Sequence, residues 1–208
     1  MIGNFYLGLI HGPVRNKWGE EVITSVTNLD IHDMARTSRT FDIKNFFIVT
    51  PVEAQIKLLN RVLGYWEKDQ ANIYNPYRFD ALARVRVARS FDELVSKVTD
   101  LEGIKPFIVA TGANFQGDNL LTPQALMNKI NQNNRPLLLL FGTGYGLLES
   151  MLDQTDALLT SICGYAPDGY NHLSVRSAVA IYSELLRMEC RVITYATNEN
   201  NSKTANNK

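Results

Sequence analysis

Short apolar runs alternate with segments of helical spacing along most of the 208-residue chain. Runs of about four to eight apolar residues between turn-forming residues are typical of buried β-strands. The run LLLLF, at the end of one of them, has no polar face, which indicates a central strand that is covered on both sides. The pattern predicts strands over residues 5–10, 46–50, 83–88, 107–111, 136–141 and 157–163.

Between these runs, apolar residues recur at steps of three and four residues, which predicts amphipathic helices. Ser90 and Thr122 stand where helix caps are needed, Asn171 lies near the start of the last helix, and Thr50-Pro51 offers a cap followed by proline. Because strand and helix alternate, we expect an α/β fold with a mainly parallel sheet and helices on both faces. The helices are expected over residues 28–41, 52–68, 91–101, 122–133 and 174–190.

The chain is expected to form one domain over residues 1–195, because we find no linker or internal repeat that divides it. The segment NENNSKTANNK at the C-terminus is polar and lacks apolar anchors. Residues 196–208 are therefore predicted to form a disordered tail.

Charge and composition exclude several classes of function. Twenty-one basic residues balance 21 acidic ones, so the chain has no global positive field. Two cysteines, Cys163 and Cys190, and three scattered histidines form no recognisable metal set, and we expect no metal. The N-terminus does not resemble a signal peptide, and no apolar run is long enough to span a bilayer. We expect a cytoplasmic protein with no membrane partner.

The loop FGTGYGL directly follows the predicted strand 136–141. Glycine lets the backbone approach a ligand closely, and ligands of open α/β sheets bind at the carboxyl ends of strands. The alternative is an ordinary tight turn between strand and helix. The spacing G-x-G-x-G, late in the chain and with no acid after the next strand, disfavours a nicotinamide-dependent oxidoreductase. The phosphate-binding pattern GxxxxGK[ST] is absent.

Two further segments carry candidate chemistry. In YNHLSVRSAVAI (170–181), polar residues open a helix whose first amides could hold an anionic group, although such residues are also ordinary caps. In NLDIHDMARTSRTF (28–41), His32 and Arg36 share one helix face, which is either a solvated basic face or a binding surface. A small basic surface is also expected on the strand 83–88 and just beyond it, from Arg84, Arg86 and Arg89.

These three segments, in this order, resemble the three motifs of the SPOUT class of RNA methyltransferases. The chain is most similar to a small group of single-domain, predicted S-adenosylmethionine-dependent RNA methyltransferases. The similarity extends from about Phe5 to Val192. The NHLSVRSA string is its most specific part, since glycine loops are common in other proteins.

The resemblance implies a fold and a cofactor site. SPOUT proteins have a parallel α/β sheet whose C-terminal part forms a deep trefoil knot, and the loops of the knot bind S-adenosyl-L-methionine mainly through backbone groups. The corresponding loops here follow the strand 107–111, follow the strand 136–141, and extend over residues 162–174. The implied cofactor-binding residues are Thr111, Gly112, Gly142, Thr143, Gly144, Gly146, Ile162, Leu173 and Ser174.

The resemblance also implies a homodimer with each active site near the subunit interface, and RNA (tRNA or rRNA) as the substrate. Arg36 matches the first-motif arginine that lies beside the target nucleotide in similar proteins. Because an arginine side chain keeps its proton in proteins, Arg36 is expected to orient a phosphate or stabilise negative charge and not to act as a general base. His32 is a weaker candidate for the base. Similar proteins often carry a glutamate in the second motif and an RNA-binding extension, both missing here.

Two functions remain open from the sequence. The first is a methyltransferase that modifies a base or a ribose of structured RNA. The second is a non-catalytic module that keeps the same knotted pocket and binds S-adenosylmethionine or RNA. The zero net charge and the missing extension slightly favour the second.

Overall fold

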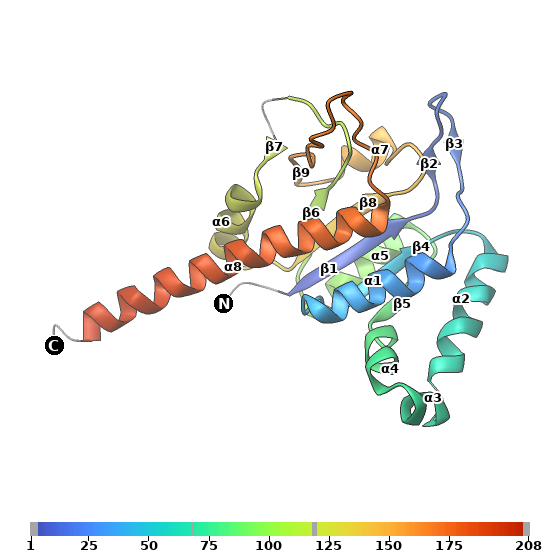
Figure 1. Cartoon of the computed structure of the whole chain (residues 1–208), viewed down its shortest axis with the longest axis horizontal. Coiled ribbons are helices and arrows are strands. Elements are labelled where there is room, and N and C mark those ends of the chain that lie inside the picture. Colours follow the sequence, from blue (N-terminus) through green and yellow to red (C-terminus); the bar gives the residue numbers. More distant parts are fainter. Residues whose placement is uncertain (1–3, 68, 118–119, 206–208) are drawn as a thin grey trace.

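A parallel β-sheet forms the centre of the computed structural model, which describes residues 4–67, 69–117 and 120–205 (Figure 1). Within these residues the sheet has seven strands, and every strand pairs in parallel with its neighbours. Leu7, for example, lies opposite Phe46 on one side and Leu139 on the other. From one edge to the other the strands are β5 (Val85–Ala88), β4 (Asn45–Val49), β1 (Phe5–Ile10), β8 (Leu137–Gly142), β6 (Phe107–Ala110), β9 (Ala157–Leu159) and β7 (Leu120–Leu121).

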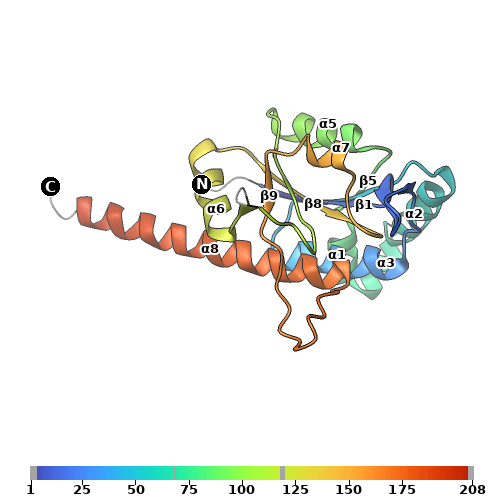
Figure 2. The ribbon, with the colours of Figure 1, turned by 90° about the horizontal axis from the view of Figure 1, so that it is seen from above.

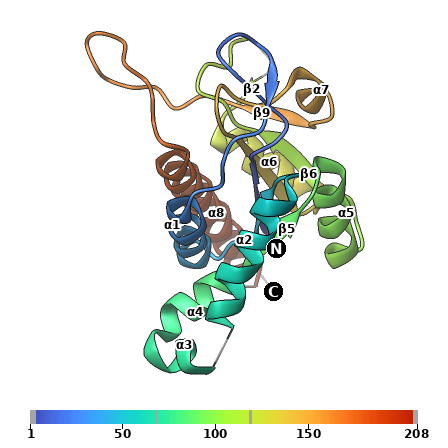
Figure 3. The same cartoon turned by 90° about the vertical axis from the view of Figure 1, so that its right-hand side faces the viewer.

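Helices cover both faces of the sheet (Figures 2 and 3). Side chains alternate along each strand, so that Leu7 and Leu9 join the core on one face while Tyr6 and Ile10 join the core on the other. The first face is covered by α1 (Asn28–Thr40), α6 (Pro123–Asn133) and α8 (Val175–Ala205), and the second by α5 (Phe91–Glu102) and α7 (Glu149–Leu152). The predicted α/β class and parallel sheet are confirmed.

Six small elements were not predicted, namely the strands β2, β3 and β7 and the helices α3, α4 and α7. A two-stranded antiparallel hairpin, β2 (Val14–Arg15) and β3 (Glu21–Val22), stands at one end of the molecule. At the opposite end, α3 (Asp69–Tyr74) and α4 (Pro76–Leu82) follow α2 (Glu53–Trp66) and project beyond the sheet (Figures 1 and 3).

Some boundaries differ from the prediction. The strand expected over 157–163 ends at Leu159, and the following residues form a long loop that leads into α8. The helix α2 begins at Glu53 with Val52 as its N-cap, so the predicted cap at Thr50-Pro51 is wrong. The caps at Ser90 and Thr122 are confirmed, because each side chain accepts a backbone N–H three residues on.

The last helix is longer than predicted. It continues to Ala205 and includes most of the segment expected to be a disordered tail. Residues 175–205 contain no glycine and no proline, so nothing in the backbone chemistry stops the helix where the side chains become polar. Residues 206–208 lie outside the described part of the chain.

Candidate functional site

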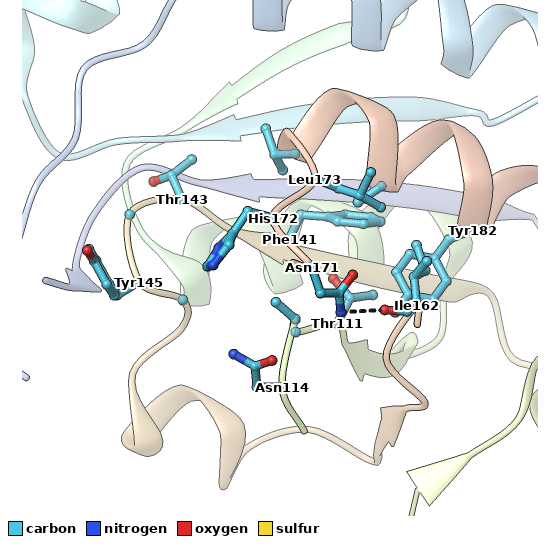
Figure 4. Close-up of a pocket in the computed structure, with 17 residues that line it drawn as sticks. Thr111, Asn114, Phe141, Thr143, Tyr145, Ile162, Asn171, His172, Leu173 and Tyr182 are labelled. Atoms are coloured by element: carbon cyan, nitrogen blue, oxygen red, sulfur yellow. Dashed lines mark hydrogen bonds between the residues drawn. The ribbon is translucent and has the colours of Figure 1, made fainter. Parts of the chain in front are cut away.

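A cavity of about 570 Å³ lies beyond the carboxyl ends of β6, β8 and β9, three neighbouring strands of the sheet (Figure 4). Parallel strands whose ends meet at one edge form the usual ligand crevice of an open α/β sheet. Its first, second and third walls are the loops after β6, β8 and β9, and the first turns of α8 complete it. The lining residues are Thr111, Gly112, Ala113, Asn114, Phe141, Gly142, Thr143, Gly144, Tyr145, Gly146, Ile162, Asn171, His172, Leu173, Val175, Ala178 and Tyr182.

The glycine loop after β8 turns back on itself so closely that side chains do not fit. A Cβ atom on Gly142 would lie 2.8 Å from the backbone nitrogen of Leu147. A Cβ atom on Gly144 would lie 2.9 Å from the carbonyl oxygen of Arg15, and Gly144 has a φ of +61°. These glycines are therefore required by the backbone path, and they leave the wall of the cavity made largely of main chain.

The hairpin β2–β3 holds this loop in place. The backbone N–H of Tyr145 donates to the carbonyl of Arg15 over 2.9 Å, and the N–H of Arg15 donates to the carbonyl of Gly146 over 3.0 Å. Thr24, just after the hairpin, lies 2.5 Å from the hydroxyl of Thr143. The unpredicted hairpin is thus the support on which the second wall of the cavity rests.

A buried histidine is linked to the glycine loop through Thr24. The Nδ1 atom of His11 lies 3.0 Å from the Thr24 hydroxyl, which links the imidazole through Thr24 to Thr143. His11 is buried, and no described group forms a hydrogen bond with its Nε2 atom. Burial lowers the pKa of His11, and the charge of Asp30 opposes this only in part. The folded protein therefore favours a neutral imidazole behind the glycine loop.

The first and third walls are also tied together, because the backbone N–H of Phe115 donates to the hydroxyl of Ser161 over 3.0 Å. The hydroxyl of Thr111 donates to the carbonyl of Leu140 over 2.8 Å. On the opposite side, the amide of Asn171 donates to the carbonyl of Ile162 over 2.8 Å, which joins the two ends of the long loop (Figure 4). Tyr182 from α8 donates to the carbonyl of Thr160 over 2.9 Å. These bonds give the cavity walls fixed positions relative to one another.

The cavity is electrically neutral. Among the described residues that line it there is no aspartate, glutamate, lysine or arginine. Burial raises the pKa of Tyr182 to about 12, so its hydroxyl remains protonated.

These walls fit S-adenosylmethionine. The volume is within the range of about 300–1,000 Å³ of small-molecule sites, and the mixture of main chain and apolar side chains is typical of such sites. A Cβ atom on Gly112 would lie 2.8 Å from the ring of Phe115, so the first wall too depends on glycine. Phe141, Ile162 and Ala178 offer apolar surface to an adenosyl group, and the bound cofactor would supply an electrophilic methyl group.

The structure brings together eight of the nine residues that the resemblance implies for the cofactor. The exception is Ser174, whose hydroxyl accepts the backbone N–H of Ser177 over 3.3 Å and caps α8 instead. Sequence reasoning missed Asn114, Tyr145 and His172, which also line the cavity. His172 lies within the third motif, but its spacing does not distinguish it from its neighbours.

The two first-motif candidates lie elsewhere. Arg36 lines a separate recess on α1 and α4, and His32 packs edge-on against Trp66 with a ring-centroid distance of 6.1 Å. Because α1 runs antiparallel to the strands, its last turns lie near the amino ends of the strands, whereas the cavity lies at their carboxyl ends. Neither residue is among those that line the cavity.

The acidic residues of the first motif have a structural role that the sequence did not reveal. Arg176 of the third motif donates to Asp30 over 2.9 Å and lies 3.4 Å from Asp33. Asp30 is almost fully buried, and it also accepts a hydrogen bond from the Thr27 hydroxyl over 2.5 Å. The first and third motifs are therefore joined by an ion pair.

The described part of the chain holds no cluster of three potential metal ligands. None of the helices described is both long and apolar enough to cross a bilayer.

Several known proteins are similar to the chain in sequence. An uncharacterized protein of Aquifex aeolicus is 34% identical over 183 residues, which are 88% of each chain. A tRNA (guanine-N(1)-)-methyltransferase of Oleidesulfovibrio alaskensis is 40% identical over 178 residues. These residues are 86% of this chain, but the chain spans only 40% of that relative's length.

The fold is also found among solved structures. A probable methylase family protein from Haemophilus influenzae matches 94% of this chain and 70% of its own, with a TM-score of 0.62 and 20% identity. Such a likeness shows a shared fold. The sequence profile of a family described as SAM-dependent RNA methyltransferase matches residues 4–187. The chain therefore belongs to the S-adenosylmethionine-dependent RNA methyltransferases, as its resemblance to the SPOUT class predicts.

Proposed function

We propose that this chain transfers a methyl group from S-adenosylmethionine to tRNA, as a homodimer in the cytoplasm. The neutral, glycine-lined cavity at the ends of β6, β8 and β9 carries this proposal, because it fits the cofactor of the family to which the chain belongs. The relative named as a tRNA methyltransferase supports tRNA over rRNA. Because the chain spans only 40% of that relative, we leave the acceptor open between a ring nitrogen and a ribose hydroxyl.

The residues of the cavity position the reactants. The glycine loop and the loop after β6 would hold the cofactor, which would supply the methyl group. Fixed positioning of two reactants contributes about 7–11 kcal/mol to a displacement reaction. Methylation of a ring nitrogen or a hydroxyl releases a proton, and the imidazole of His172 is the group at the mouth of the cavity that we propose to accept it.

The dimer is supported by an apolar stripe along α8. Its residues recur at alternating steps of four and three, the spacing of a helix–helix seam. Between 36% and 71% of each residue is exposed, although all are apolar or aromatic. A second copy would also allow the Arg36 of one protomer to approach the cavity of the other, which a single protomer does not do. The α8 stripe consists of Ile181, Leu185, Met188, Val192 and Tyr195.

Labelled methyl incorporation into total tRNA tests the function directly. We expect the purified protein to transfer label to tRNA, and Gly144→Val to abolish both transfer and binding of S-adenosylhomocysteine in calorimetry. Binding without transfer to either tRNA or rRNA would instead identify a non-catalytic module. No binding at millimolar S-adenosylhomocysteine would refute the cofactor assignment.

The trefoil knot remains a prediction of the resemblance. The strand order supports it, because β8 lies between β1 and β6, and α8 then runs across one face of the sheet (Figure 1). Slow, incomplete refolding after dilution from denaturant, compared with an unknotted α/β protein of equal length, would support it.

A further inference from the structure

A second recess, of about 450 Å³, lies between the last turns of α1 and the helix α4. It shares no lining residue with the cofactor cavity. Asn75 and the helix α4 form its outer side. The helices α3 and α4 project from the molecule at the end opposite the hairpin β2–β3 (Figures 1 and 3). The lining residues are Arg36, Arg39, Thr40, Asn75, Tyr77, Arg78, Asp80 and Ala81.

This recess has an excess of positive charge. Three arginines and one aspartate line it, and the aspartate, Asp80, already forms an ion pair with Arg39. Neither Arg36 nor Arg78 has an ion-pair partner among the described residues. Both guanidinium groups therefore retain donors for an anion, and the planar fork of arginine suits a phosphate.

Arg78 is also held in position. Its guanidinium lies over the ring of Trp66 at 5.4 Å from the ring centroid. Trp66 in turn contacts His32 on α1, whose pKa is lowered first by burial and then by the charge of Arg78. The positive charge of Arg78 is thus fixed beside α1 by packing on an aromatic ring.

Two tyrosines at the recess are almost fully exposed. Tyr77, which lines the recess, is 87% exposed, and Tyr74, next to the lining residue Asn75, is 86% exposed. Exposed aromatic rings next to unpaired arginines combine the two contacts that proteins make with unpaired RNA, which are base stacking and phosphate binding.

We propose that this recess and its tyrosines form an RNA-binding surface that takes an unpaired segment of the substrate, with phosphates on Arg36 and Arg78 and bases on Tyr74 and Tyr77. This inference rests on the proposed function, which makes RNA the partner. It assigns an RNA-binding role to α4 and to the end of α3. A partner protein on this surface is the alternative that the experiment excludes.

Fluorescence anisotropy with labelled tRNA, over a range of KCl concentrations, tests the surface in the full chain. Tyr77→Ala should weaken binding about five- to hundredfold, the range measured for loss of one stacked base. Tyr77→Phe keeps the ring and should bind as the wild type does. Arg78→Gln should weaken binding and reduce the salt slope by about one phosphate contact.

Lys105→Gln is the matched control, because it removes one exposed positive charge from the loop after α5, on the other face of the sheet. It should change neither the affinity nor the salt slope. A fully paired RNA duplex should bind with equal affinity to the wild type and to Tyr77→Ala.

Calorimetry with S-adenosylhomocysteine separates this inference from the proposed function. All four variants should bind it as the wild type does, since none of the changed residues lines the cofactor cavity. If Tyr77→Ala and Arg78→Gln both bind tRNA with wild-type affinity and salt slope, the RNA surface is refuted and the cofactor site stands. If the wild type fails to bind S-adenosylhomocysteine, the proposed function itself is refuted.

Discussion

The Nη1 atom of Arg176 donates to Oδ1 of Asp30 over 2.9 Å and so connects the first turn of α8 with the first turn of α1. The carboxylate side chain is only 6% exposed and the guanidinium 29% exposed. Residues that are 146 positions apart in the sequence thereby hold the start of α8 against the sheet, directly beside the cavity that α8 helps to line.

Removal of Arg176 should destabilise the fold. Arg176→Met leaves a buried carboxylate without its cation, and breaking such a pair costs about 3–5 kcal/mol. We expect a loss near 3 kcal/mol in the free energy of unfolding, because Thr27 still donates to Asp30. Chemical denaturation measures it. The double variant with Asp30→Leu should lose less than the sum of the two single variants, and simple additivity would contradict the coupling.

The glycine loop should not tolerate a single methyl group. Gly142→Ala brings a Cβ atom to 2.8 Å from the Leu147 nitrogen, so the loop must shift and cofactor binding should weaken by at least tenfold. Titration calorimetry with S-adenosylhomocysteine measures the affinity. The control is Gly64→Ala on α2, where a Cβ atom would meet nothing within 4 Å. That change should leave the affinity unaltered and stabilise the fold by about 0.5–1 kcal/mol.

Acid should weaken the fold through His11. Its pKa is depressed by burial, so the folded state binds a proton less readily than the unfolded state, whose pKa is about 6.5. The contribution of His11 to stability is therefore complete above about pH 6.5 and is lost as the pH falls towards its folded pKa. The melting temperature should decrease between pH 7.5 and pH 5.

Replacement of this histidine identifies its share of that decrease. His11→Leu should flatten the profile of melting temperature against pH in part, because the half-buried His32 also has a lowered pKa and contributes in the same direction. The double variant His11→Leu, His32→Gln should be flatter still. A profile of wild-type steepness in the double variant would show that these histidines do not control acid stability.

The proposed proton acceptor can be separated from cofactor binding. His172→Ala should lower the rate of methyl transfer by about 100-fold or more, the usual contribution of a general base. Because the imidazole is exposed at the mouth, binding of S-adenosylhomocysteine should change little. Added imidazole should restore part of the rate. An unchanged rate in the variant would assign the proton to solvent.

The α8 stripe should control assembly. Met188, at the centre of the stripe, is 52% exposed in one protomer. In a homodimer packed through the stripe, Met188→Glu would bury a carboxylate against its own copy and should yield monomers in analytical ultracentrifugation. Glu189→Gln, one residue away on the helix, is the matched control and should leave the dimer intact. A wild type that sediments as a monomer at micromolar concentration would refute the stripe as an interface.

The parts of the fold that sequence reasoning predicted are those with a strong local signal. The strand at 136–141 has an unbroken apolar run, and Ser90 and Thr122 stand directly before helical spacing. The hairpin β2–β3 gave no such signal, because two-residue strands are too short to show alternation. Its role follows from the structure, in which the backbone of Arg15 forms hydrogen bonds with the glycine loop.

The candidate site shows the same limit. The glycines could be predicted to line a cavity because glycine is needed where backbone segments approach closely. The position of Arg36 could not, since a residue on a helix face is placed by the packing of that helix against others. The pairing of Asp30 with Arg176 is equally invisible in the chain, because ion pairs between distant segments have no spacing rule.

The helix α8 begins as a wall of the cofactor cavity, through Val175, Ala178 and Tyr182, and continues without interruption into the α8 stripe. One continuous helix thus contributes to both the cofactor cavity and the proposed subunit interface. If cofactor binding restrains this helix, the two binding events are coupled. Dimerisation then raises the affinity for the cofactor, and the cofactor raises the affinity of the subunits for each other by the same factor. Protein concentration would then act on this enzyme as an effector.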